Sequence, residues 1–131
     1  MKEKYLILSN FDVFREEHNK LIKRAAGRGD AIIGIPTDEF AYELQGYYPV
    51  HDYQKRYAYV SKHSFNSEIW QVKNKRDIDD LLKKCTTMFL SSYENYRMQD
   101  FLKRIYFNKK IEVHPEKKKR LSTGNNMNKK Q

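Results

Sequence analysis

The chain has 131 residues, 39% of them hydrophobic and 14% aromatic, and a formal net charge of +9. This length and composition predict one globular domain that folds without metal or disulfide support. A single cysteine, Cys85, excludes an internal disulfide and favours a reducing, cytoplasmic setting. No apolar run approaches the roughly 20 residues of a membrane span or resembles a secretory signal.

The first half of the chain predicts two buried strands separated by a helix. A nearly continuous apolar run at 4–9 is typical of a strand buried on both faces. An amphipathic helix is predicted at 18–29, with Gly27 and Gly29 at its end. A second strand at 30–36 stops at Pro36, and a short helix begins after Thr37, a suitable N-cap.

The second half continues the alternation. A loop is predicted at 46–51 and a helix at 52–63. Strands and helices then alternate: strand 67–72, helix 76–85, strand 87–92, helix 97–107 and strand 110–114. We expect Trp70 to lie in the core. The pattern predicts an α/β fold with a Rossmann-like, five-stranded parallel sheet and helices on both faces. In such sheets a ligand binds beyond the carboxyl ends of the strands, beside the first strand, which is where residues 9–18 lie.

The positive charge is concentrated near the C-terminus. Residues 109–131 hold eight Lys or Arg against two Glu, which is +6 of the total of +9. We therefore predict an α/β domain over 1–115 and a basic, flexible tail over 116–131. Such a tail binds RNA, an anionic membrane surface or a nucleotide phosphate, or it is simply solvated.

Five segments, in this order along the chain, carry a family resemblance: NFDVFREEHNKLIKRA (10–25), GDAIIGIPTDEF (29–40), YQKRYAYV (53–60), DFLKR (100–104) and RLSTG (120–124). Together they resemble the nucleotidylyltransferases typified by glycerol-3-phosphate cytidylyltransferase. In that family the first strand runs into a Gly-Thr-Phe-Asp-x-x-His-x-Gly-His turn. The resemblance implies the nucleotidylyltransferase fold and transfer of CMP from CTP to a polyol phosphate, as in cell-surface polymer synthesis, with Mg²⁺ held mainly by the phosphates.

The resemblance also assigns site residues. His18 matches the second histidine of the turn, and Arg15 stands in the place of the first, so both are candidate catalytic residues that stabilise charge on the phosphoryl oxygens. The candidate nucleotide-binding residues are Asn10, Phe11, Asp12, Arg56, Ser122 and Thr123. No residue is assigned as a metal ligand.

Several positions depart from the family pattern. Glu16 and Glu17 fill the next two places of the turn, including that of the glycine, and Ser9 and Asn10 replace Gly-Thr. The loop that carries lysines in the family is matched by YELQGYYP (42–49), which has none, and Ser91-Ser92 stand where the family has Gly-Asp. A carboxylate is itself stabilised in the first turn of a helix, by roughly 0.3–1 kcal/mol, and repels a triphosphate there. These changes predict a damaged triphosphate site.

Three functional hypotheses follow. The chain is an active cytidylyltransferase-like enzyme, or it is an inactive relative that serves as a binding or dimer-forming module. Alternatively, it binds nucleic acid through the basic tail and the tyrosine-rich segment 47–59, whose rings either stack bases or pack in the core.

Overall fold

The computed structural model describes residues 3–115, which form one five-stranded sheet. The strands are β1 (Lys4–Leu8), β2 (Asp30–Pro36), β3 (Glu68–Val72), β4 (Thr87–Ser91) and β5 (Lys110–His114). They lie in the order β3-β2-β1-β4-β5, and every neighbouring pair is parallel. The Rossmann-like parallel sheet is therefore confirmed.

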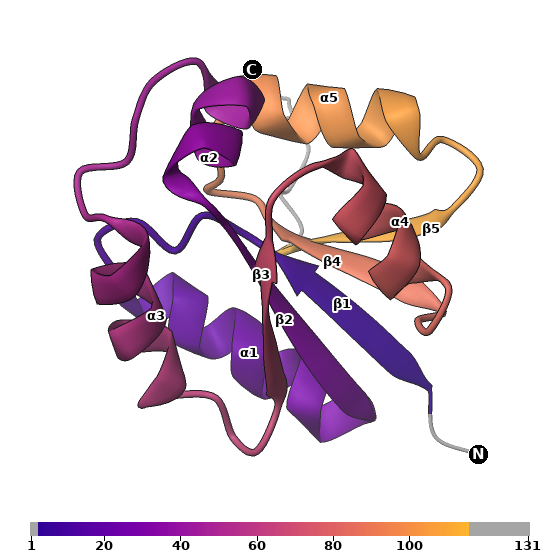
Figure 1. Cartoon of the computed structure of the whole chain (residues 1–131). Helices are drawn as coiled ribbons and strands as arrows, with labels where there is room; N and C mark the ends of the chain where they lie inside the picture. The colour runs from indigo at the N-terminus through magenta and orange to yellow at the C-terminus, as the bar shows by residue number, and fades with distance from the viewer. Residues whose placement is uncertain (1–2, 116–131) are drawn as a thin grey trace, which may run out of the picture.

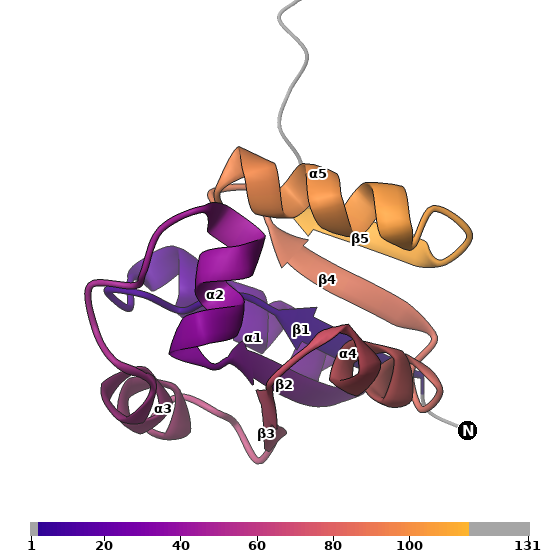
Figure 2. The ribbon, with the colours of Figure 1, turned by 45° about the horizontal axis from the view of Figure 1, so that its top comes forward.

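Five helices cover the two faces of this sheet: α1 (Glu16–Arg28), α2 (Asp38–Gln45), α3 (Tyr53–Ser61), α4 (Lys75–Leu82) and α5 (Tyr96–Ile105). Figure 1 shows the helices around the sheet, and in Figure 2 α1 lies behind the sheet while α2, α4 and α5 lie in front of it. The chain builds the sheet outward from β1 through β2 to β3 and then crosses to β4 on the other side of β1. The switch point is therefore between β1 and β4, at their carboxyl ends.

Two hydrophobic clusters fix these layers. Alternate residues of β1 point to opposite faces, as the pleat of a strand requires. One cluster joins β1 to α1 and α3 through Tyr5, Ile7, Leu21, Ile22, Ala25 and Val60, and the other joins β1 to α2, α4 and α5 through Leu6, Leu8, Leu44, Ile78, Leu81 and Leu102.

The helices α2 to α5 begin with side-chain caps. Thr37, Asp52, Asn74 and Asn95 each accept a hydrogen bond from the backbone N–H three residues on, as good N-caps do. The start of α1 is different, because its N-cap is Arg15 and the side chain of His18 accepts the hydrogen bond of the Arg15 N–H.

Two expectations from the sequence are wrong. The helix predicted at 18–29 begins earlier, at Glu16, and runs through Gly27 to end at Arg28, with Gly29 as its C-cap. Trp70 is 43% exposed rather than buried, because β3 is an edge strand, and the ammonium of Lys84 stands over the indole ring. None of the described helices is long and apolar enough to span a membrane.

Candidate functional site at the strand switch point

A cavity of about 470 Å³ lies at the switch point. We call it the switch-point cavity. Its lining comes from the β1–α1 loop, the start of α1, the end of α2 with the loop after it, and the β4–α5 loop: Asn10, Asp12, Val13, Arg15, Glu17, His18, Gln45, Tyr47, Val50, Tyr93, Glu94 and Asn95. The cavity is thus where a parallel sheet of this topology places a ligand.

The β1–α1 loop is held in a conformation that side chains rarely adopt. Phe11 and Val13 both have positive φ, at 53° and 50°. The Phe11 ring is fully buried and packs against Phe14 and His18, with ring centroids 6.4 and 5.3 Å away. Burial of a ring this large offsets the roughly 1–2 kcal/mol that a left-handed residue costs. Phe11 therefore stabilises the loop conformation through its buried ring, and it is not among the residues that line the cavity.

Asp12 ties this loop to the loop between α2 and α3. Its two carboxylate oxygens accept hydrogen bonds from the backbone N–H groups of Val50 and His51, at 2.7 and 2.9 Å. Both oxygens are already engaged by protein donors, so Asp12 positions one wall of the cavity.

His18 is a neutral imidazole of fixed tautomer. Its Nδ1 accepts the Arg15 N–H at 3.0 Å, which leaves the ring proton on Nε2. Burial beside Phe11 and Phe14 lowers the pKa of His18 to about 4, and the charge of Arg15 also lowers it. Within the described part of the chain no residue is recorded as a partner for Nε2, so this N–H is a donor for a ligand.

Asn10 lines the same cavity and has a buried, unpaired acceptor atom. It is only 1% exposed, and its Nδ2 donates to Gln45 Oε1 at 2.8 Å. Gln45 in turn donates through Nε2 to the Tyr47 carbonyl at 3.0 Å, which fixes the orientation of both amides. Asn10 Oδ1 is buried and has no hydrogen-bond partner in the described structure. A buried acceptor of this kind costs about 1–3 kcal/mol when it stays unpaired, so a donor that reached it would stabilise the site.

Glu94 brings a carboxylate from the β4–α5 loop. Its Oε1 accepts the Ser9 hydroxyl at 2.5 Å, and the Asn10 backbone N–H also donates to it. Burial raises the pKa of Glu94, the nearby charge of Asp12 raises it further, and the two hydrogen bonds oppose this. Glu94 thus joins the loop after β4 to the loop after β1 across the switch point.

Arg56, a predicted nucleotide contact, is part of the scaffold. Its guanidinium is fully buried and donates to the carbonyls of His51 and Asn10 at 3.0 and 2.9 Å. It also pairs with Asp38 at 2.7 Å, at the first turn of α2. Arg56 does not line the switch-point cavity. It reaches the site indirectly, by fixing the Asn10 backbone from behind.

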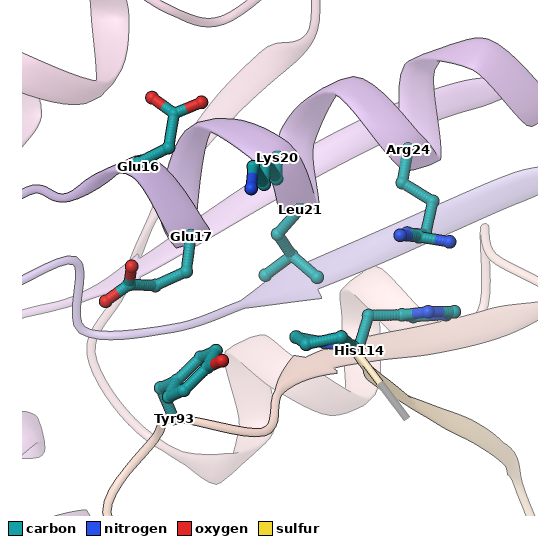
Figure 3. A pocket seen from close by; sticks show the side chains of 8 residues that line it. Glu16, Glu17, Lys20, Leu21, Arg24, Tyr93 and His114 are labelled. Carbon is teal, nitrogen blue, oxygen red and sulfur yellow. The ribbon is translucent and has the colours of Figure 1, made fainter. Parts of the chain in front are cut away.

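A second hollow of about 280 Å³ adjoins the switch-point cavity and shares Glu17 and Tyr93 with it. It lies between α1 and the ends of β4 and β5, and its lining is Glu16, Glu17, Lys20, Leu21, Arg24, Tyr93, His114 and Pro115. Figure 3 shows Glu17 and Arg24 directed from α1 toward the side where Tyr93 and His114 lie, whereas Glu16 points the other way. Acidic and basic side chains are mixed here, so this hollow has no clear preference for an anion.

The charges that line the switch-point cavity are mainly negative. Among the described residues, three carboxylates (Asp12, Glu17 and Glu94) face a single guanidinium, that of Arg15. His18 adds no charge near neutral pH because of its low pKa.

The structure brings four of the predicted site residues to one cavity: Asn10, Asp12, Arg15 and His18. Ser122 and Thr123, and the basic tail 116–131, lie outside the described residues. The sequence interpretation did not assign Gln45, Glu94 or Asn95 to the site, and it named Tyr47 only as part of the tyrosine-rich segment. A signal for Glu94 and Asn95 was present, because a switch point between the first and fourth strands brings the loops after these strands together.

Comparison with models of known protein families, and with curated proteins, finds no match. A solved structure is similar: a lipopolysaccharide core biosynthesis protein from Thermoplasma volcanium, with a TM-score of 0.64 and 13% identity. The match covers 86% of this chain and 94% of the other. At this identity the likeness shows a shared α/β fold.

Proposed function

We propose that this chain is a nucleotidylyltransferase-like protein that binds a small molecule in the switch-point cavity and has lost nucleotidyl transfer. One observation carries the proposal: the cavity presents three carboxylates and one guanidinium where a nucleotide triphosphate would have to enter. The unpaired Oδ1 of Asn10 and the free Nε2 of His18 support the binding of a ligand.

The electrostatic argument concerns the first turn of α1. The N–H groups and dipole at a helix start attract anions, but Glu16 and Glu17 occupy that field themselves. Glu17 also lines the cavity, so its charge faces an incoming ligand. Arg56 cannot compensate, because three of its donors are already bound to protein oxygens and its guanidinium is buried.

A second candidate is the transfer of CMP from CTP to a polyol phosphate. The observation in its favour is the fixed tautomer of His18, which leaves an N–H donor suited to a phosphoryl oxygen, with Arg15 in the same lining. Within residues 3–115 no cluster of three or more His, Cys, Asp or Glu side chains could hold a metal ion, and the family resemblance implies that Mg²⁺ is held mainly by the phosphates. The likeness to a lipopolysaccharide core biosynthesis protein supports a setting in cell-surface polymer synthesis.

The test combines binding with turnover on the full chain. CTP with Mg²⁺ is titrated calorimetrically, and pyrophosphate release is followed with glycerol 3-phosphate and ribitol 5-phosphate as acceptors. We expect no turnover and weak binding of CTP. Acceptor-dependent pyrophosphate release that His18→Gln abolishes would establish the second candidate instead.

Two variants test the charge explanation directly. Glu17→Gln removes one carboxylate from the cavity and keeps Arg15, so it is expected to raise CTP affinity about fivefold, since a carboxylate near the phosphates costs on the order of 1 kcal/mol. Glu16→Gln is the matched control, because Glu16 has the same charge one residue away but does not line the cavity. Arg15→His combined with Glu17→Gly restores the family turn but also removes the guanidinium, so it should raise the affinity less. Equal effects of the two glutamine variants would contradict the argument.

A further inference from the structure

The switch-point cavity offers both acceptors and donors. Its acceptors include the carboxylates of Glu17 and Glu94, and Asn10 adds a buried Oδ1 that has no partner among the described residues. Its donors are the Arg15 guanidinium, the Nε2–H of His18 and the hydroxyls of Tyr47 and Tyr93. A ligand that satisfies this lining must itself donate hydrogen bonds and tolerate negative charge around it.

We propose that the ligand is a small hydroxylated amine, such as an amino alcohol or amino sugar, whose ammonium group donates to Asn10 Oδ1 and is balanced by Glu94 and Glu17. This inference rests on the ligand-binding function proposed above and names its substrate class.

The role of Asn10 follows from the amide network. The Tyr47 carbonyl accepts from Gln45 Nε2, so Gln45 presents Oε1 to Asn10, and Asn10 must present Nδ2 in return. Oδ1 is consequently the polar atom of Asn10 that remains for a ligand, and as an acceptor it requires a donor. A phosphate oxygen or a carboxylate cannot fill this position, whereas an ammonium or a hydroxyl can.

The charge of the cavity lining favours an ammonium group over a hydroxyl group as the donor. Two backbone N–H groups donate to the Asp12 oxygens. Among the described residues, no side chain donates a hydrogen bond to the Glu17 carboxylate. Glu94 adds a second carboxylate, held by Ser9. Two carboxylates that share a cavity favour a cationic ligand over a neutral one of the same shape.

Aromatic rings at the edge of the cavity favour the same ligand. Tyr47 and Tyr93 belong to the lining and are 52% and 64% exposed, and Asn95 donates to the Tyr47 hydroxyl at 3.5 Å. Exposed tyrosine faces beside carboxylates bind ammonium groups through cation–π attraction.

The test uses two matched series of ligands on the full chain, followed by NMR titration. The first is 2-amino-1,3-propanediol, glycerol and glycerol 3-phosphate, and the second is glucosamine, glucose and glucose 6-phosphate. We expect the amine to bind about tenfold more tightly than the neutral compound in at least one series, and the phosphate to bind most weakly, with dissociation constants on the order of 1 mM for ligands this small. Equal affinity of amine and neutral compound, or tighter binding of the phosphate or of CTP, overturns the amine inference and leaves the ligand-binding function standing. Failure of every compound, CTP included, overturns the ligand-binding function and the amine inference with it.

Variants test which residues contact the ligand. Glu94→Gln is expected to lower the affinity for the amine about tenfold and to leave that for the neutral compound within about twofold. Asn10→Leu is expected to weaken both, and Glu16→Gln, outside the cavity, to change neither. A Glu94→Gln variant that is folded and keeps the full preference for the amine contradicts the role of this carboxylate. If that variant does not fold, the comparison of amine with neutral compound on the unaltered chain still decides the proposal.

Discussion

Replacing Arg56 tests whether this buried cation holds the candidate site together. Its guanidinium is fully buried and makes three hydrogen bonds, to the Asn10 and His51 carbonyls and to Asp38. Arg56→Met keeps most of the aliphatic bulk and removes all three donors. Three segments then lose their common partner: the β1–α1 loop, the loop before α3, and the first turn of α2.

The expected loss of stability is about 3 kcal/mol. Removing one partner of a buried pair costs about 3–5 kcal/mol, and the lower end applies because the Asp38 side chain is 34% exposed and regains water. With a urea m-value of about 2 kcal/mol per molar, the midpoint of unfolding falls by about 1.5 M. Arg56→Lys should lose less stability than Arg56→Met, because it keeps the positive charge. It should still lose some, because an ammonium group lacks the planar guanidinium that reaches three oxygens.

The assay is urea unfolding followed by circular dichroism, with Asp38→Asn as the control on the exposed side of the pair. That variant keeps an oxygen that accepts from Arg56 but leaves the buried guanidinium without this counter-ion, so it is expected to lose about 1–3 kcal/mol. If Arg56→Met loses under about 1 kcal/mol, the guanidinium does not hold these segments together, and a ligand-binding role for Arg56 returns.

Three further predictions concern α1 and β5. Burial lowers the pKa of His18 to about 4, so on acidification the unfolded chain binds a proton at this residue before the folded chain does. The contribution of His18 to stability is therefore complete above about pH 6.5 and falls by roughly 2–3 kcal/mol as the pH drops toward 4. Urea midpoints of the unaltered chain and of His18→Gln, compared over pH 4–7, should show this slope. Gly27→Ala should stabilise the chain by about 1 kcal/mol, since open space surrounds that position in the helix, whereas Gly29→Ala should destabilise it because a Cβ there overlaps a backbone oxygen; thermal melts that rank the two variants the other way would contradict the packing. Arg28 donates two hydrogen bonds to the Glu112 carboxylate and holds the pKa of that carboxyl at about 2. Glu112→Gln should therefore lower the free energy of unfolding at pH 7 by about 1 kcal/mol or less, because the pair is partly exposed. The stability difference between the two chains should vanish as the pH falls from 4.5 toward 2.

The place of the cavity and the chemistry of its lining have different origins in this fold. The strand order makes a binding crevice at the ends of β1 and β4 whatever residues lie there. What the crevice accepts depends on side chains from loops far apart in the sequence, such as Asn10, Gln45 and Glu94. Under the proposed function, the carboxylates at this place favour a ligand that donates hydrogen bonds over a polyphosphate.

The sequence by itself determined the elements and their order. Runs such as 4–9 and 30–36 are continuously apolar because both faces of these strands are covered, and this pattern is local and readable. Alternation with helices then implied parallel pairing and a crevice near residues 9–18, where Asn10, Arg15 and His18 do meet. The boundary error at α1 has a local cause, since Glu16 and Glu17 continue the helix without belonging to its apolar face.

Only the tertiary structure decided which polar groups are buried and which are free. Arg56 follows the helical pattern of a solvated residue, yet it is enclosed because two loops fold over it. Glu94 meets Ser9 across 85 positions of sequence, and Asn10 meets Gln45 across 35. Periodicity reports which face of an element is apolar, but hydrogen-bond partners and the cost of leaving one unpaired depend on distances between loops, and those are set only when the whole chain packs.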